Sequence, residues 1–305
     1  MPIPASPMTR ANIPNLLELG VRRTYFNEYE LYGRQYETLY NMNVSKKRTE
    51  TDVMLAGVST FQPKVEGDSP FFDAGAQAWT KAYTALTWAL GIELSEEGIE
   101  DDLYNYYSRM GGELGRAAYY TREIEAMTPF NDLASTIYTA GGTNYTLLQT
   151  NQFRIDGGTW SNKLATPADL SIESLETLLI QWRTGMLDQR GRKMLVPPAV
   201  LLVGPSDEWI AKRILMSEKR PESNFNDPNV VRTERNLRVH VSDFMTDDGR
   251  WFILAPKGDT GLQYNDRRPN TMRRRDDSRT GNQLMIGSYR ESHGLSHVYG
   301  LLGSS

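Results

Sequence analysis

The side chains that could support catalysis or metal binding are few and poorly placed for either. The complete set of histidines is His240, His293 and His297. Only the last two have the i, i+4 spacing with which a helix presents two ligands to one metal ion. Because Gly294 and Ser296 favour an extended segment there, and Glu291 is the only nearby carboxylate, we predict no metal site. The chain has no cysteine, which excludes disulfides and thiolate ligands.

Three consecutive acidic residues, Glu100, Asp101 and Asp102, are the other candidates for chemistry, as a general acid and base. Consecutive positions on a helix point in different directions, however, and acids at a helix start are favoured by the helix dipole. The sequence also lacks the GxxxxGK[ST] phosphate loop, the GxSxG elbow and the dinucleotide fingerprint. We therefore predict no catalytic residue and no cofactor. A carboxylate-dependent soluble hydrolase stays as the alternative from a different functional class.

A charge run between two expected strands suggests contact with another chain. Its members are Arg267, Arg268, Arg273, Arg274, Arg275, Asp276, Asp277 and Arg279. Pro269 and Gly281 bound this segment, so we predict a loop. Mixed signs within one loop favour ion pairing with a neighbouring subunit over phosphate binding. The formal net charge of -4 likewise argues against a protein that mainly grips nucleic acid.

Residues 44–94 have the pattern of a long hairpin. The second leg, residues 83–94, alternates large apolar residues with small or polar ones, which is the period of a half-buried strand. The first leg, residues 44–55, is largely charged. At about 3.3 Å per residue the hairpin reaches roughly 40 Å, and isolated two-stranded hairpins are marginal in water. We therefore expect another chain to cover it, with contact candidates at the tip: Pro63, Lys64, Glu66, Asp68, Phe71 and Phe72.

A long helix is predicted directly after the hairpin, over residues 95–127. Ser95 can cap it, apolar residues recur at helical spacing, and Pro129 is expected to stop it. Gly111 and Gly112 lie near its middle. Close packing against a neighbouring element is the interpretation we favour for this pair, and a bend between two assembly states is the alternative.

The remaining sequence predicts a mixed α+β fold. With 305 residues, 39% of them hydrophobic, the chain can form one large or two modest domains. We expect helices over residues 15–32, 171–187 and after a cap at Ser206; strands over 199–203, 237–241, 251–255 and 284–289; and hairpin turns at Gly141-Gly142 and Gly157-Gly158. Neither a signal peptide nor a membrane span is predicted, so we expect a soluble protein made in the cytoplasm.

Several strings, in this order, carry a family resemblance. They are Glu66-Gly67, Phe72-Asp73, TWALGIELS at residues 87–95, IEDDLY at 99–104, GTWSNKLAT at 158–166, VPPA at 196–199, Gly261-Leu262, Arg268-Pro269 and VYG at 298–300. Over roughly residues 13–302 the chain resembles the major head subunit of Mu-like tailed phages, the gpT-like branch of the Hong Kong 97 capsid fold. It departs from that pattern at Thr150-Asn151-Gln152, where the family commonly has a histidine.

The resemblance implies a part for each segment. The expected division is an N-terminal arm at residues 1–44, an extended E-loop hairpin at 45–93, a peripheral domain with the spine helix at 94–165 and 242–290, and an axial α/β domain at 166–241 and 291–305. The E-loop is expected to lie over an adjacent subunit, and the arginine-rich loop near threefold contacts.

The implied function is mechanical. Pentamers and hexamers of the chain are expected to close into an icosahedral phage head around double-stranded DNA. The expected partners are other copies of the chain, portal and scaffold proteins, decoration proteins in some heads, and DNA held by non-specific contact. The expected location is the virion, after assembly in the host bacterial cytoplasm. An encapsulin-like cargo shell is the alternative that shares the fold.

Overall fold

A computed structural model describes residues 14–95, 97–98, 101, 106–220, 227–234 and 237–305. Its helices are α1 (Pro14–Leu31), α3 (Tyr106–Asn131), α4 (Ile172–Gly185), α5 (Glu208–Met216) and α6 (Val230–Glu234). Its strands are β1 (Asn41–Val44), β2 (Thr49–Leu55), β3 (Gln77–Thr84), β4 (Leu86–Leu94), β5 (Thr136–Ala140), β6 (Thr143–Thr146), β7 (Gln152–Phe153), β8 (Thr159–Trp160), β9 (Val200–Val203), β10 (Arg238–Val241), β11 (Trp251–Leu254), β12 (Leu262–Asp276), β13 (Gln283–Leu295) and β14 (Leu301–Ser304).

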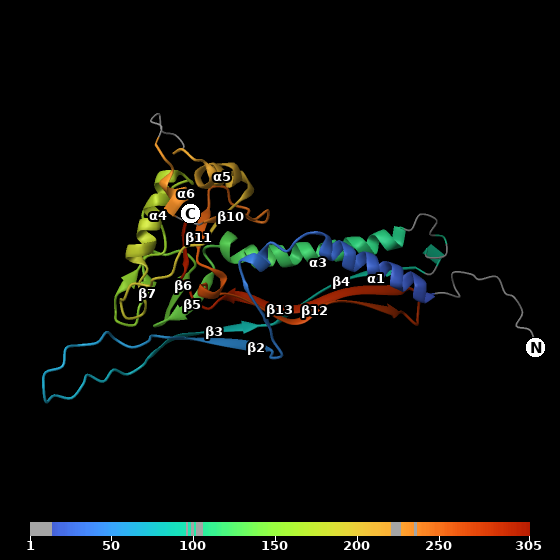
Figure 1. The fold of residues 1–305 in the computed structure, drawn as a ribbon. Coiled ribbons are helices and arrows are strands. Elements are labelled where there is room, and N and C mark those ends of the chain that lie inside the picture. The colour runs from blue at the N-terminus through green and yellow to red at the C-terminus, as the bar shows by residue number, and fades with distance from the viewer. Residues whose placement is uncertain (1–13, 96, 99–100, 102–105, 221–226, 235–236) are drawn as a thin grey trace, which may run out of the picture.

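A long sheet with two helices on one face forms the extended half of the molecule (Figure 1). Its strand order is β1-β12-β13-β4, with β1 parallel to β12 and the other pairs antiparallel. Helices α1 and α3 cross over this sheet, and Val21, Tyr25, Leu114, Met272 and Met285 form the buried cluster between the layers. The ribbon of β2 and β3 leads into β4 and lies at the end of this sheet that is nearest the compact half (Figure 1).

Three glycines let α1 and α3 approach closely. A methyl group added at Gly115 would lie 2.2 Å from the backbone oxygen of Tyr25, and one at Gly111 would lie 2.3 Å from a side-chain carbon of Val21. Gly112 has two side-chain atoms of α1 at 3.1 Å. Because these atoms of α1 leave no room for a Cβ on α3, only glycine at these positions permits the helices to cross so closely. The glycine pair that the sequence predicted to allow close packing therefore contacts α1 of the same chain.

The compact half is built on a second sheet, ordered β10-β9-β11-β14, and holds most of the main core. Strands β9 and β11 are buried along their whole length, as expected for a sheet covered on both faces. Helix α4 starts with a capping box, in which the Ser171 hydroxyl accepts from the Ser174 N–H. The predicted Ser206 cap is wrong: a 3-10 turn over Pro205–Asp207 comes first, and Asp207 occupies the cap position of α5.

The predicted hairpin is present but has a different pairing. β2 pairs with β3, and the segment between residues 55 and 77 projects away from the body (Figure 1). The predicted second leg is interrupted at Ala85, after which β4 leaves the ribbon and pairs with β13 of the long sheet. The two predicted short hairpins form as β5–β6 and β7–β8.

One further prediction needs correction, and another is tested only in part. Pro129 lies inside the last turn of α3 and does not stop it. Its missing N–H leaves the Glu125 carbonyl without a helical donor, but only the last turn of the helix is affected. The predicted start of the helix is only partly described: the Ser95 hydroxyl accepts from the Gly98 N–H at 3.2 Å, as a cap does, whereas Glu100 and Asp102 lie outside the described residues.

The arginine-rich run is mostly strand and not the predicted loop. Residues 267–276 belong to β12, and only residues 277–282 form the turn to β13. Register shifts between Asp266 and Arg268, and between Arg268 and Thr271, accommodate Pro269 within the strand. Among the residues described, no helix combines the length and apolar character that crossing a membrane requires.

Candidate assembly surfaces

The hairpin tip is an apolar segment without cover in the single chain. Phe61 is fully exposed, Phe72 is 83% exposed and Phe71 61%. The base of the hairpin is anchored, because Asp73 accepts from the Ser59 N–H at 2.6 Å and lies 3.5 Å from an Arg190 nitrogen. The other predicted tip residues, Pro63, Lys64, Glu66 and Asp68, are also exposed. Large exposed aromatic side chains on an anchored projection are typical of an interaction surface.

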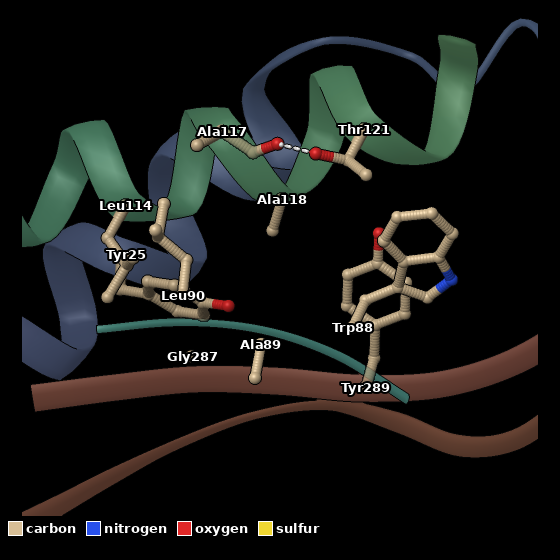
Figure 2. Close-up of a pocket in the computed structure, with 10 residues that line it drawn as sticks. All are labelled: Tyr25, Trp88, Ala89, Leu90, Leu114, Ala117, Ala118, Thr121, Gly287 and Tyr289. Carbon is tan, nitrogen blue, oxygen red and sulfur yellow. Dashed lines mark hydrogen bonds between the residues drawn. The ribbon is translucent and has the colours of Figure 1, made fainter. Parts of the chain in front are cut away.

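A second uncovered apolar surface lies along β4. Leu86, Trp88 and Leu90 face the helix side of the sheet, but Leu86 and Leu90 are 58% and 56% exposed. Figure 2 shows the reason, since α3 presents Ala117, Ala118 and Thr121 across a gap from this strand. That cavity has a volume of about 70 Å³, and an adjoining groove of about 310 Å³ shares Trp88 with it. β4 is also the edge strand of its sheet, so its outer backbone groups are open to another chain.

Arg273, Arg274 and Arg275 lie next to the β12–β13 turn, at the end of the long sheet away from the hairpin tip (Figure 1), whereas Arg267 and Arg268 lie near the middle of β12. Arg273 and Arg275 are exposed, Arg274 pairs with Asp276 at 3.1 Å, and Asp277 lies in the turn. Arg267 and Arg268 are half-buried, and each has a buried guanidinium nitrogen without a hydrogen-bond partner. The chain therefore does not bring its two predicted contact sets together. They can meet only between copies.

Behind the arginines, a buried ionic cluster ties α3 to the sheet. Arg122 lies 3.3 Å from Glu291 and 3.8 Å from Asp266, and its guanidinium stacks over the Tyr289 ring at 4.3 Å. The Tyr264 hydroxyl donates to Glu291. Burial raises the pKa of Glu291, while the Arg122 charge opposes that shift. This cluster fixes the helix over β12 and β13 and has the character of a structural ion pair.

Two other buried groups have shifted pKa values. Burial raises the pKa of Glu123 to about 7, against the effect of its two backbone donors, Gln35 and Tyr36. Burial lowers the pKa of both His293 and His297 to about 4. Both rings are thus neutral at physiological pH. In the described part of the chain, no group of three or more His, Asp or Glu side chains is arranged to hold a metal ion.

Sequence reasoning missed several residues that hold these surfaces in place. Gly115 makes the closest approach between α1 and α3, and its spacing of one helical turn from Gly111 was the available signal. The ion pair between Arg122 and Glu291 could not be predicted from the sequence, because the two residues are 169 positions apart and meet only in the folded chain. Of the acids considered for catalysis, Asp101 is exposed and its backbone N–H donates to the Glu97 carbonyl.

Comparison with known proteins identifies the family. A family model described as phage capsid protein matches residues 77–293. The chain belongs to this phage capsid protein family. The matched range includes β3, β4, α3, β12 and all but the last two residues of β13. A search of curated proteins finds no matching sequence.

Solved structures share the fold at low sequence identity. The structure of Microbacterium phage Oxtober96 aligns with a TM-score of 0.57 at 9% identity, over 90% of this chain and 91% of that one. The virus-like particle from Pyrococcus furiosus gives 0.55 at 11% identity, over 93% and 97%. The procapsid of bacteriophage JBD30 gives 0.52 at 14% identity, over 98% and 76%. The phage capsid protein has the α+β, Hong Kong 97-like capsid fold, and its role is that of a shell-forming major capsid protein.

Proposed function

We propose that this phage capsid protein assembles as pentamers and hexamers into an icosahedral head that encloses double-stranded DNA. The observation that carries the proposal is the anchored hairpin with the bare aromatic tip, Phe61, Phe71 and Phe72. A monomer would leave this tip, and the apolar face of β4, in water. Large obligate interfaces bury such surface, so the hairpin of one copy is expected to lie over the next copy.

The same proposal assigns parts to the segments. Residues 1–44 are the N-terminal arm, 45–93 the E-loop, 94–165 and 242–290 the peripheral domain, and 166–241 and 291–305 the axial domain. The proposed boundary after residue 290 falls inside β13, which continues to Leu295. Helix α1, which falls within the proposed arm, packs on α3 of the proposed peripheral domain.

The activity proposed is structural, without catalysis. Portal and scaffold proteins, and decoration proteins in some heads, are the proposed partners, with assembly in the host cytoplasm. DNA contact is proposed to be non-specific, in keeping with the net charge of -4. Membership of the Mu-like branch stays a prediction.

Sedimentation and electron microscopy of the purified protein test the proposal. Closed shells of megadalton mass, with fivefold and sixfold clusters, are the expected result, and a dispersed monomer at all protein concentrations contradicts it. The contents of shells made during infection separate the phage head from the encapsulin-like alternative. A head contains DNA that is protected from nuclease, whereas a cargo shell contains a second protein and no genome.

A further inference from the structure

The face of the long sheet that is turned away from α3 carries two arginines in direct opposition. Arg268 of β12 and Arg290 of β13 are partners across the antiparallel pair. Tyr289 and Glu291 contact Arg122 of α3, so alternation places Arg290 on the opposite face. Arg268 reaches the same face, because its guanidinium donates to the Ser288 hydroxyl at 3.0 Å.

The positive charge of this arginine pair is not balanced by a carboxylate within the described residues. Like charges directly opposite on a sheet are destabilising, and the Nε atoms of both Arg268 and Arg290 are buried without a hydrogen-bond partner. Among the described residues no carboxylate forms an ion pair with either of them. Asp266 and Glu291, their nearest acidic neighbours in sequence, are engaged by Arg122 on the other face. The side chains of Arg268 and Arg290 are both only half-buried, so an incoming carboxylate can pair with their outer guanidinium nitrogens and offset the charge repulsion between them.

The surface beside the pair leaves room for a chain to approach. Thr87 is the β4 partner of Arg290, and Ala89 is the β4 partner of Ser288. Both are small and exposed. An approaching turn can therefore reach the arginines over β4 without displacing a large side chain.

The hairpin tip supplies the complementary charge. Glu66 and Asp68 flank Gly67, which has a φ of +89°, and the Asp68 N–H closes the turn onto the Val65 carbonyl at 3.2 Å. Both carboxylates are exposed, and neither forms an ion pair within the described chain. Two carboxylates in one tight turn match two arginines on neighbouring strands, whose Cβ atoms lie about 5 Å apart.

We infer that the Arg268–Arg290 pair is the acceptor for the Glu66–Asp68 turn of a second copy, so that carboxylate–guanidinium pairing sets where the hairpin of one subunit lands on the next. The inference rests on the proposed shell assembly and adds the residues that select the landing site. Phosphate groups of nucleic acid are the competing occupant, and the test below distinguishes the two.

Neutral variants on each side test the pairing. R268Q/R290Q removes the repulsion, so the unassembled subunit should melt at the same temperature or higher, while the protein concentration needed for shell formation should rise about tenfold. E66Q/D68Q lies in an exposed turn and should give the same assembly defect without changing the fold. R183Q is the matched control, because Arg183 is exposed on α4 and should leave assembly unchanged.

Complementation and cross-linking complete the test. The charge-exchange variant E66R/D68R/R268E/R290E should assemble better than either E66R/D68R or R268E/R290E alone. Since the chain has no cysteine, D68C combined with R290C should give disulfide-linked ladders of subunits in oxidised shells, whereas D68C with R238C should not. Normal assembly of R268Q/R290Q overturns the inference, as does normal assembly with loss of packaged DNA, which would assign the pair to phosphate. Absence of shells from the wild-type protein would contradict the proposed function itself. Shells from wild type together with normal assembly of R268Q/R290Q would contradict only the inference about the arginine pair.

Discussion

The crossing of α1 over α3 depends on Gly115, and substitution by alanine tests this directly. Alanine in a helix interior is favoured over glycine by about 1 kcal/mol. At Gly115, however, the added methyl group would lie 2.2 Å from the Tyr25 backbone oxygen. A backbone atom cannot rotate away, so α1 must shift by about 1 Å, and overpacking of this kind typically costs about 1–3 kcal/mol. We expect G115A to lower the free energy of unfolding by up to about 2 kcal/mol after the propensity gain.

Gly20 provides the matched control on the partner helix. A Cβ at Gly20 would meet nothing within 4 Å, so G20A should raise the free energy of unfolding by up to about 1 kcal/mol. Thermal and urea unfolding of the unassembled subunit measure both variants. A gap of about 1–3 kcal/mol between them supports the close crossing. If G115A proves as stable as G20A, the helices do not approach as described and the reasoning is refuted.

Three further predictions concern the tip, a buried acid and a helix cap. F71S/F72S should change the subunit's unfolding free energy by less than about 0.5 kcal/mol, because both rings are exposed, yet it should prevent shell formation in sedimentation velocity; normal shells contradict a tip contact. Burial raises the pKa of Glu123 from 4.5 to about 7, so its contribution to stability is full below pH 4.5 and is lost as pH rises through 7. Between pH 5 and 7, the free energy of unfolding of E123Q, measured in urea, should therefore rise relative to that of wild type by at most about 1.4 kcal/mol per pH unit. A difference that is independent of pH argues against a buried, protonated Glu123. S171A should lower the free energy of unfolding by about 1 kcal/mol, measured as a fall of about 2 °C in melting temperature, whereas an unchanged melting temperature would show that the capping box is not stabilising.

Local patterns predicted much of this structure. The alternation of residues 86–94 indicated which face of β4 turns inward, and Ser171 and the two glycine pairs marked a helix start and two turns. The exposure of the hairpin tip was expected from the length of the hairpin and from the glycines and prolines that interrupt it. In each case the deciding interaction lies within a few residues of the signal, so sequence spacing is sufficient.

The features that depend on pairing between residues far apart in the sequence could not be predicted. The charges and Pro269 of residues 267–276 are typical of a loop, but pairing with β13 and two register shifts make this segment a strand. The Arg268–Arg290 opposition depends on the same register. Such contacts are set by tertiary structure and leave no periodic trace in the sequence.

Analytical ultracentrifugation of the purified protein, with electron microscopy of the fastest fraction, tests the central claim most directly. The account predicts closed megadalton shells in which the segment between β2 and β3 of each subunit lies on the surface of a neighbouring copy. A stable monomer whose hairpin folds back to cover Phe61, Phe71 and Phe72 on its own body would contradict it.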